Sequence, residues 1–256
     1  MPESDLALLI RAARDAGEIA LGFWRTDQTV WHKDDNAGPV SEGDYATDTA
    51  LRTSLTAARP GYGWLSEETP DDAVRLARET AFVVDPIDGT RAYVDGQDTW
   101  ALSLAVVSGG SPTAAVVYLP ARGTLYAAAR GEGATRDEAP IAASSRTDLA
   151  EATLLAPRPS LDAQHWPGGV PPVTRAFRPS LAWRLALVAE GAFDAMLTFR
   201  DAWEWDIAAG ALIAAEAGAT VTDRTGAPLA FNSAAARTPG ALVAPPALHA
   251  ALMARR

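Results

Sequence analysis

The chain has 256 residues, of which 48% are hydrophobic and 21% are charged, and its net charge is −10 at pH 7. This is a globular composition with enough length for a full core, and its acidity disfavours nucleic acid polymers and anionic membranes as partners. The lack of cysteine excludes disulfides, thiolate nucleophiles and sulfur-bound metals. No apolar run reaches membrane-spanning length and the N-terminus lacks a signal pattern, so we expect a cytoplasmic protein.

The first part of the chain predicts two helices joined by a polar segment. Ser4 can cap a helix that runs to about Trp24, with apolar residues on one face. Residues 30–43 are polar and contain Gly and Pro, which predicts a loop or a mobile hairpin. A second helix is expected from near Asp44 until just before Pro60, because proline interrupts helical hydrogen bonding.

Strand signals follow in the middle of the chain. Residues 81–84 form a short apolar run that ends at Asp-Pro, as a buried strand does. Residues 100–107, 113–119 and 124–129 are separated by turn-forming segments, which predicts antiparallel hairpins.

The last part of the chain begins with an irregular connection and then becomes helical. Residues 157–179 contain six prolines and two glycines, so they are expected to link two halves without regular structure. Helices are predicted from about Ser180 to Glu190 and from Trp205 to Ala217, each ended by glycine. A further strand is expected at 220–222.

The segment Val84-Asp85-Pro86-Ile87-Asp88-Gly89-Thr90 carries the strongest chemical signal. Two carboxylates and the Ile87 carbonyl converge within four residues, and hard oxygen ligands of this kind suit magnesium. Thr90 follows at the start of a short helix, whose amide groups can accept a phosphate. An ordinary Asp-Gly turn with a capping threonine would show the same pattern, so this segment alone leaves both interpretations open.

Two further acidic sites favour the metal interpretation. Glu67 and Glu68 follow a segment that predicts a turn into a strand, and Asp206 lies in the first turn of an apolar helix. Each site alone is ordinary, since glutamate pairs are often solvated and an early aspartate complements the helix dipole. Together with Asp85 and Asp88, they predict a cage of four carboxylates around divalent cations.

These motifs resemble the inositol monophosphatase family, which belongs to the lithium-sensitive, metal-dependent phosphatase superfamily. The matching segments follow one another in the family's order over nearly the whole chain: Lys33 with the loop to Asp44, the Glu67-Glu68 pair, residues 85–90 and residues 205–218. The resemblance implies an α+β fold of alternating layers, a five-layered αβαβα sandwich with mixed sheets, usually in a homodimer. It implies one phosphatase domain over residues 1–256, with an α+β half to about 155 and an α/β half from about 156.

The resemblance also implies the roles of the site residues. A first magnesium would be bound by Glu67, Asp85, the Ile87 carbonyl and Thr90, a second by Asp85, Asp88 and Asp206, and a third, weaker ion near Glu67. Such enzymes hydrolyse a phosphate ester through attack by a metal-activated water.

Around this metal site, Asp44 and Thr90 would orient and deprotonate the water, and Glu68 would support Glu67. The amides of Asp88, Gly89 and Thr90 would bind the phosphate, and lithium would inhibit by replacing one magnesium. Lys33 matches a basic residue of the family's lid loop, although a solvated lysine fits as well.

The substrate stays open between three phosphate esters. Phe199 occupies the position at which inositol-specific members carry glutamate, which weakens that assignment. Residues 204–206 and 228–232 resemble the CysQ-type 3′(2′),5′-bisphosphate nucleotidases, although Ala182 replaces their usual lysine. Arg91 resembles a residue of histidinol-phosphate phosphatases. We expect 3′-phosphoadenosine 5′-phosphate or inositol monophosphate ahead of histidinol phosphate, with substrate contacts from Arg184, Phe199, Arg200 and Glu204.

Other function classes have less support in the sequence. A non-catalytic relative that only binds metal or phosphate should have lost a carboxylate or the threonine, and all of these are present. There is no G-x-x-x-x-G-K-[ST] loop for nucleotide triphosphates and no G-x-S-x-G elbow for a serine hydrolase. A two-carboxylate glycosidase would use similar residues but would need no magnesium.

Overall fold

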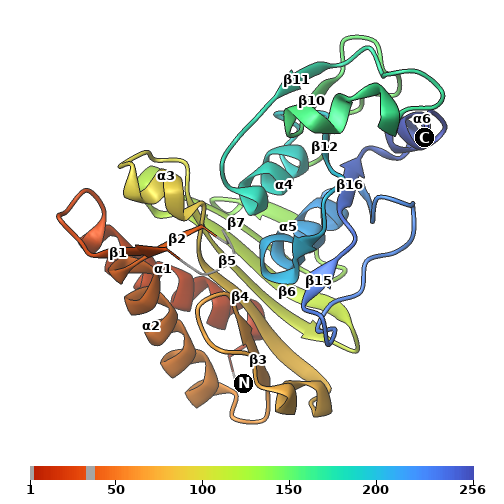
Figure 1. The fold of residues 1–256 in the computed structure, drawn as a ribbon. Helices are drawn as coiled ribbons and strands as arrows, with labels where there is room; N and C mark the ends of the chain where they lie inside the picture. Colours follow the sequence, from red (N-terminus) through yellow and green to blue (C-terminus); the bar gives the residue numbers. More distant parts are fainter. Residues whose placement is uncertain (1–2, 33–37) are drawn as a thin grey trace.

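The computed structural model describes residues 3–32 and 38–256, and Figure 1 shows its arrangement. Residue 33, the predicted lid lysine, lies outside the described residues. The α-helices of the described chain are α1 Asp5–Phe23, α2 Glu42–Ala58, α3 Thr90–Val94, α4 Leu181–Ala189, α5 Glu204–Glu216 and α6 Pro246–Met253. None of the described helices combines the length and the apolar character that crossing a membrane requires.

The larger sheet has seven strands in the order β3-β4-β5-β6-β7-β8-β9. Its first two strands pair in parallel and all later neighbours pair antiparallel, so the sheet is mixed. The strands are β3 Gly63–Ser66, β4 Thr80–Asp88, β5 Ala101–Ser108, β6 Ser111–Leu119, β7 Thr124–Ala129, β8 Ala134–Arg136 and β9 Ala139–Pro140.

A second sheet of five strands follows the order β11-β10-β12-β16-β14 and is also mixed. Its strands are β10 Thr153–Leu155, β11 Thr174–Ala176, β12 Ala195–Thr198, β14 Thr220–Thr222 and β16 Ala241–Ala244. Two small ribbons complete the described strands: β1 Val30–His32 with β2 Pro39–Ser41, and β13 Ala202–Trp203 with β15 Arg237–Thr238.

The elements stack as five layers in the order helix, sheet, helix, sheet, helix (Figure 1). Side chains alternate across β5, because successive residues of a strand point to opposite faces. Leu102 and Leu104 join the core under α1 and α2, whereas Ala105 and Val107 join the core under α4 and α5.

The second sheet repeats this alternation on the other side of α4 and α5. Met196 of β12 points into the core shared with these two helices. Its neighbour Leu197 points outward and packs in a separate cluster with Leu248 and Leu252 of α6. The layered αβαβα architecture expected from the sequence is confirmed.

Most of the elements predicted from the sequence are present, with shifted boundaries. Ser4 caps α1 through the Ala7 amide, as expected. The second helix begins earlier than predicted, since Ser41 is its cap and Asp44 is its third residue. The strand predicted at 81–84 continues to Asp88, so the predicted metal-binding motif lies on the strand's end rather than beyond it.

Six strands and one α-helix after residue 150 had not been predicted: β10, β11, β12, β13, β15, β16 and α6. The expectation that residues 157–179 lack regular structure is wrong at β11, which pairs in parallel with β10. The strands β10, β12 and β16 have three or four residues each and are almost fully buried. A short apolar run without alternation does not distinguish strand from helix, so only the pairing within the sheet identifies them.

Candidate active site

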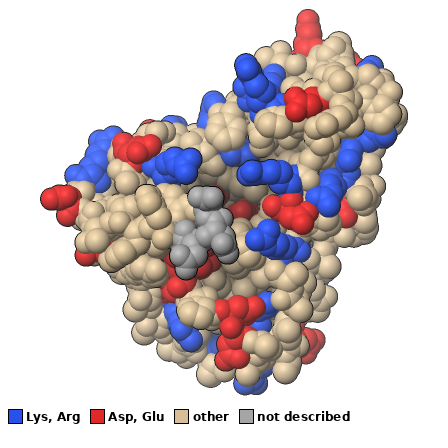
Figure 2. All heavy atoms as spheres, viewed as in Figure 1, with Lys and Arg blue, Asp and Glu red and all other residues tan. Residues whose placement is uncertain are grey.

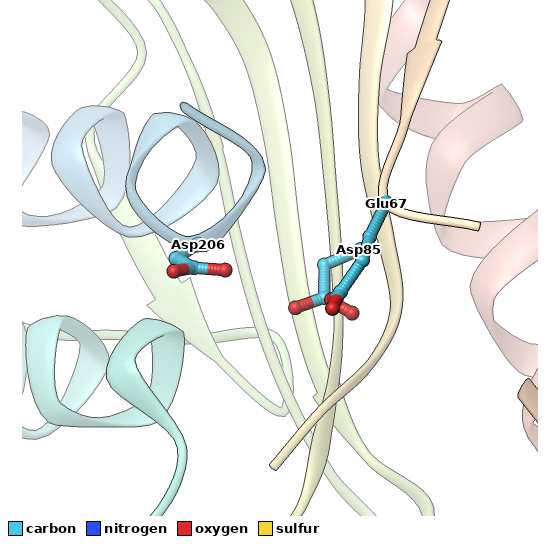
Figure 3. A group of neighbouring side chains, drawn as sticks. All are labelled: Glu67, Asp85 and Asp206. Atoms are coloured by element: carbon cyan, nitrogen blue, oxygen red, sulfur yellow. The ribbon is translucent and has the colours of Figure 1, made fainter. Parts of the chain in front are cut away.

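Three of the four predicted metal-binding carboxylates meet between the larger sheet and α5. Glu67 directly follows β3, Asp85 lies near the end of β4 and Asp206 lies in the first turn of α5, and their oxygens lie within 4.8 Å of one another (Figure 3). The parallel pairing of β3 with β4 brings the first two together, and the Glu67 amide donates to the Val84 carbonyl at 3.2 Å. Figure 3 shows Asp206 directed from the helix toward Asp85.

The three residues of this cluster carry like charges, and Asp85 at its centre is buried, whereas Glu67 and Asp206 are partly exposed. Asp85 is 1% exposed. Burial, and then repulsion from Glu67 and Asp88, raises the pKa of Asp85 well above its usual range. Burial, and then repulsion from Asp88 and Glu67, does the same to the pKa of Asp206. No ion pair among the described residues includes Asp85 or Asp206. A group of carboxylates that converge in this way fits a divalent cation with a preference for hard oxygen ligands.

Asp88, the fourth predicted carboxylate, lies beside this trio and faces α4. Its Oδ2 accepts hydrogen bonds from the Ser180 hydroxyl and the Ala182 amide, both at 2.6 Å. Burial raises the pKa of Asp88 to about 6, and the Ser180 hydrogen bond opposes that increase. The sequence analysis missed these two partners, although the position of Ser180 at a helix start was visible.

Asp44 and Thr90, the predicted water-activating pair, are in contact. Thr90 Oγ1 lies 3.0 Å from Asp44 Oδ1 and 3.2 Å from the Ile87 carbonyl oxygen. The other oxygen of Asp44 accepts from the amide and the hydroxyl of Ser41, at 2.9 and 2.5 Å. Burial raises the pKa of Asp44 to about 6, partly offset by the Ser41 and Thr90 hydrogen bonds. The capping box of α2 therefore holds a carboxylate against the end of β4.

The segment that carries Glu67 and Glu68 is fixed at both ends by one buried aspartate of α2. Asp48 accepts hydrogen bonds from the Ser66 hydroxyl at 2.5 Å and the Thr69 hydroxyl at 2.6 Å. The sequence analysis missed Asp48. Its position four residues after Asp44, on the same side of a helix, was the available signal.

The turn after Asp88 requires glycine. Gly89 has φ of +98°, in the left-handed region that residues with a Cβ adopt only with strain. Gly89 thereby lets the chain pass directly from β4 into α3, which sets Thr90 beside Asp44.

A cavity of about 650 Å³ opens beside Asp88 and Asp206. Figure 2 shows a hollow near the centre of this face, where basic and acidic side chains both gather. Three of the predicted substrate contacts line the cavity: Arg184, Phe199 and Arg200.

Glu204, the fourth predicted substrate contact, does not line this cavity. It is 0% exposed and accepts hydrogen bonds from the Asn232 and Ser233 amides, at 2.6 and 3.0 Å. In the structure Glu204 therefore has a different role: its side chain connects the start of α5 to a turn that is distant in the sequence. The same turn binds Arg75, whose guanidinium donates to Asn232 Oδ1 and the Ser233 carbonyl.

Comparisons with known proteins agree with this architecture. The sequence model described as "Inositol monophosphatase family" matches residues 1–256. The chain is 32% identical to an inositol-1-monophosphatase of Rhizobium meliloti over 232 residues, covering 86% of each chain. It is 34% identical to a 3′-phosphoadenosine 5′-phosphate phosphatase of Mycobacterium bovis over 196 residues, covering 74% of this chain and 71% of that one. Among solved structures, the extragenic suppressor protein suhB of Bartonella henselae has a TM-score of 0.84 at 26% identity, covering 97% and 96% of the two chains.

Proposed function

The chain belongs to the inositol monophosphatase family and is a phosphoric monoester hydrolase, and from this premise we propose that it uses magnesium bound by Glu67, Asp85, Asp88 and Asp206. One observation carries the proposal: oxygens of Glu67, Asp85 and Asp206 lie within 4.8 Å of one another. Carboxylate oxygens are the protein ligands that magnesium prefers. Asp88 and the Ile87 carbonyl lie on the same stretch of chain and would complete the set.

When bound, divalent cations at this position would polarise the phosphate oxygens and lower the pKa of a coordinated water. The chain itself supplies the proton acceptor. Thr90 Oγ1 donates to Asp44 Oδ1, so its lone pairs are free to accept a hydrogen bond from the attacking water. Asp44 is held by Ser41 and can receive the proton that passes through Thr90.

Other residues have supporting parts in this proposal. The amides of Asp88, Gly89 and Thr90 would bind the phosphate oxygens, because the left-handed turn at Gly89 starts a helix there. Glu68 would steady Glu67, and Asp48 would hold the segment that carries both.

We further propose a single domain, because both sheets share the α4 and α5 layer, with its two halves dividing near residue 155. We also propose lithium inhibition, a homodimer and a cytoplasmic location, all on the family resemblance.

The substrate is a small phosphate ester. Inositol monophosphate and 3′-phosphoadenosine 5′-phosphate are supported by the printed names of the relatives. Phe199 in the cavity offers no acid for ring hydroxyls, which favours the nucleotide over the inositol ester. Histidinol phosphate ranks third.

The test is phosphate release from these three esters side by side, with magnesium, with added lithium and with excess chelator. We expect activity that requires magnesium, decreases with lithium and is nearly abolished by Asp88→Asn. Undiminished turnover in excess chelator would overturn the proposal.

A further inference from the structure

We propose that Gly43 and Tyr93 are positioning residues for the proton acceptor: their contact sets how far α2 lies from α3, and so whether Asp44 reaches Thr90. The inference rests on the proposed function, because Asp44 and Thr90 are the pair that would receive the proton of the attacking water. It adds two residues whose effect on the reaction would pass through the hydrogen bond between this pair.

Two contacts lie side by side between the two helices. Gly43 and Asp44 are the second and third residues of α2, and Thr90 and Tyr93 are the first and fourth residues of α3. Residues three apart in a helix lie on the same side. Thr90 Oγ1 lies 3.0 Å from Asp44 Oδ1, and the Tyr93 ring lies against Gly43. A shift of α2 relative to α3 at one contact therefore also changes the other.

Gly43 leaves room for Tyr93. Its backbone is helical, a conformation that alanine adopts at least as well as glycine. The reason for glycine therefore lies in the neighbouring side chain. A Cβ built on Gly43 would overlap the Tyr93 hydroxyl and would stand 2.9 Å from the ring carbons Cε1 and Cζ. The lack of a side chain at this position lets the ring approach the backbone of α2 closely.

Tyr93 is fixed by the elements around it. The residue is 0% exposed, and its hydroxyl donates to the Ala20 carbonyl of α1 at 2.7 Å. Its ring meets Trp100 edge-on, with the ring centroids 4.8 Å apart and the planes at 81°. A larger residue at position 43 would therefore displace the start of α2 rather than Tyr93.

The start of α2 is also held by the segment that precedes β1. Gln28 Oε1 accepts a hydrogen bond from the Gly43 amide at 3.0 Å. The Thr29 carbonyl accepts from the Glu42 amide at 3.1 Å, and the Glu42 carboxylate accepts from the Thr29 amide at 2.9 Å. The capping box holds the Asp44 side chain to the same helix start. The carboxylate therefore moves with the start of α2 as one unit.

The hydrogen bond between Asp44 and Thr90 tolerates little displacement. A Cβ on Gly43 would need about 0.5–1 Å of further separation before it reached ordinary contact with the Tyr93 ring. A movement of this size would lengthen the bond to about 3.5–4 Å, where a hydroxyl and a carboxylate no longer form a hydrogen bond. Misplacement of a catalytic group by about 1 Å can lower the rate about 100-fold.

The experiment compares Gly43→Ala, Tyr93→Phe and the double variant on whichever of the three esters the wild type hydrolyses fastest. Gly43→Ala should lower kcat about 10- to 100-fold and leave KM within about threefold, because the Asp44–Thr90 bond acts on the reaction rather than on substrate binding. Tyr93→Phe alone should leave kcat within about threefold. In the double variant the ring, released from Ala20, can tilt away from the new methyl group, so kcat should recover at least about fivefold over Gly43→Ala.

Gly22→Ala is the matched control, since Gly22 is exposed on α1 and a Cβ there would meet nothing within 4 Å. We expect it to leave kcat and KM unchanged. Thermal unfolding by circular dichroism, in chelator and with magnesium, measures the metal site separately. The increase in Tm with magnesium should be about the same for Gly43→Ala as for the wild type, whereas a merely structural role would lower Tm and leave the kcat of the folded protein unchanged.

Three results would overturn the positioning role while magnesium-dependent release continued. They are a kcat of Gly43→Ala within about threefold of the wild type, no recovery in the double variant, and loss of the magnesium-induced increase in Tm of Gly43→Ala. If Gly43→Ala does not unfold cooperatively, Tyr93→Leu takes its place: it removes the ring that sets the separation, and an unchanged kcat would overturn the role. Absence of magnesium-dependent release from every ester by the wild type would instead overturn the proposed function.

Discussion

Replacing Asp206 by asparagine should stabilise the protein without metal and weaken its stabilisation by magnesium. Asp206 faces Asp85 and Glu67 across at most 4.8 Å. At an effective dielectric constant of about 20, two unit charges at that separation repel by about 3.5 kcal/mol. The substitution removes two such repulsions, and the new amide can donate a hydrogen bond to Asp85.

Several effects reduce this gain. In the wild type, protonation of the crowded carboxylates already relieves part of the repulsion. The substitution also removes a negative charge from the start of α5, where its interaction with the helix dipole contributes about 0.3–1 kcal/mol of stability. We therefore expect a net increase of about 1–3 kcal/mol in the free energy of unfolding. For a chain of this size, that corresponds to a Tm roughly 2–12 °C higher.

Magnesium should reduce the difference in the free energy of unfolding between the two proteins. A ligand that binds only the folded state increases the free energy of unfolding by about 2.7 kcal/mol when its concentration is a hundred times its Kd. The variant lacks one of the metal-binding carboxylates, so magnesium should stabilise it less than the wild type.

The assay is thermal unfolding by circular dichroism, in chelator and in a magnesium titration. Asp15→Asn, an exposed change on α1, is the control and should shift Tm little in either buffer. A lower Tm for Asp206→Asn than for wild type in chelator would refute the repulsion argument.

Three further predictions concern contacts around the site. Asp44→Asn should lower kcat about 10²- to 10⁴-fold in a phosphate-release assay, because the proton acceptor of Thr90 is lost; a decrease under tenfold would contradict that role. Arg75→Met should cost about 1–3 kcal/mol in denaturant unfolding, because Asp71 and the turn at Asn232 and Ser233 lose the hydrogen bonds of the buried guanidinium; unchanged stability would contradict this role. Gly210→Ala should cost about 1–3 kcal/mol in the same assay, because the new Cβ would collide with Leu185 of α4. An increase in stability, as expected for an exposed helical glycine, would show instead that α4 and α5 can move apart.

Much of the fold could be predicted from short segments. The caps at Ser4 and Ser180 and the antiparallel run from β5 to β7 depend on neighbouring residues and on hydrophobic alternation. The turn at Gly89 could be predicted for a similar reason, because its local backbone conformation favours glycine. Elements without such local signals, such as β12 and β16, were missed because only pairing in the sheet defines them.

The sequence by itself determined which residues are the candidates for the chemistry, because Asp85, Asp88 and Thr90 share one turn and the family motifs indicate their partners. Only the tertiary structure decided how distant residues meet. Packing of α5 against the larger sheet sets Asp206 opposite Asp85, and the start of α4 engages Asp88. Likewise, Glu204 accepts hydrogen bonds from a remote turn and does not line the cavity. Contacts of this kind depend on how whole layers stack, which no local spacing encodes.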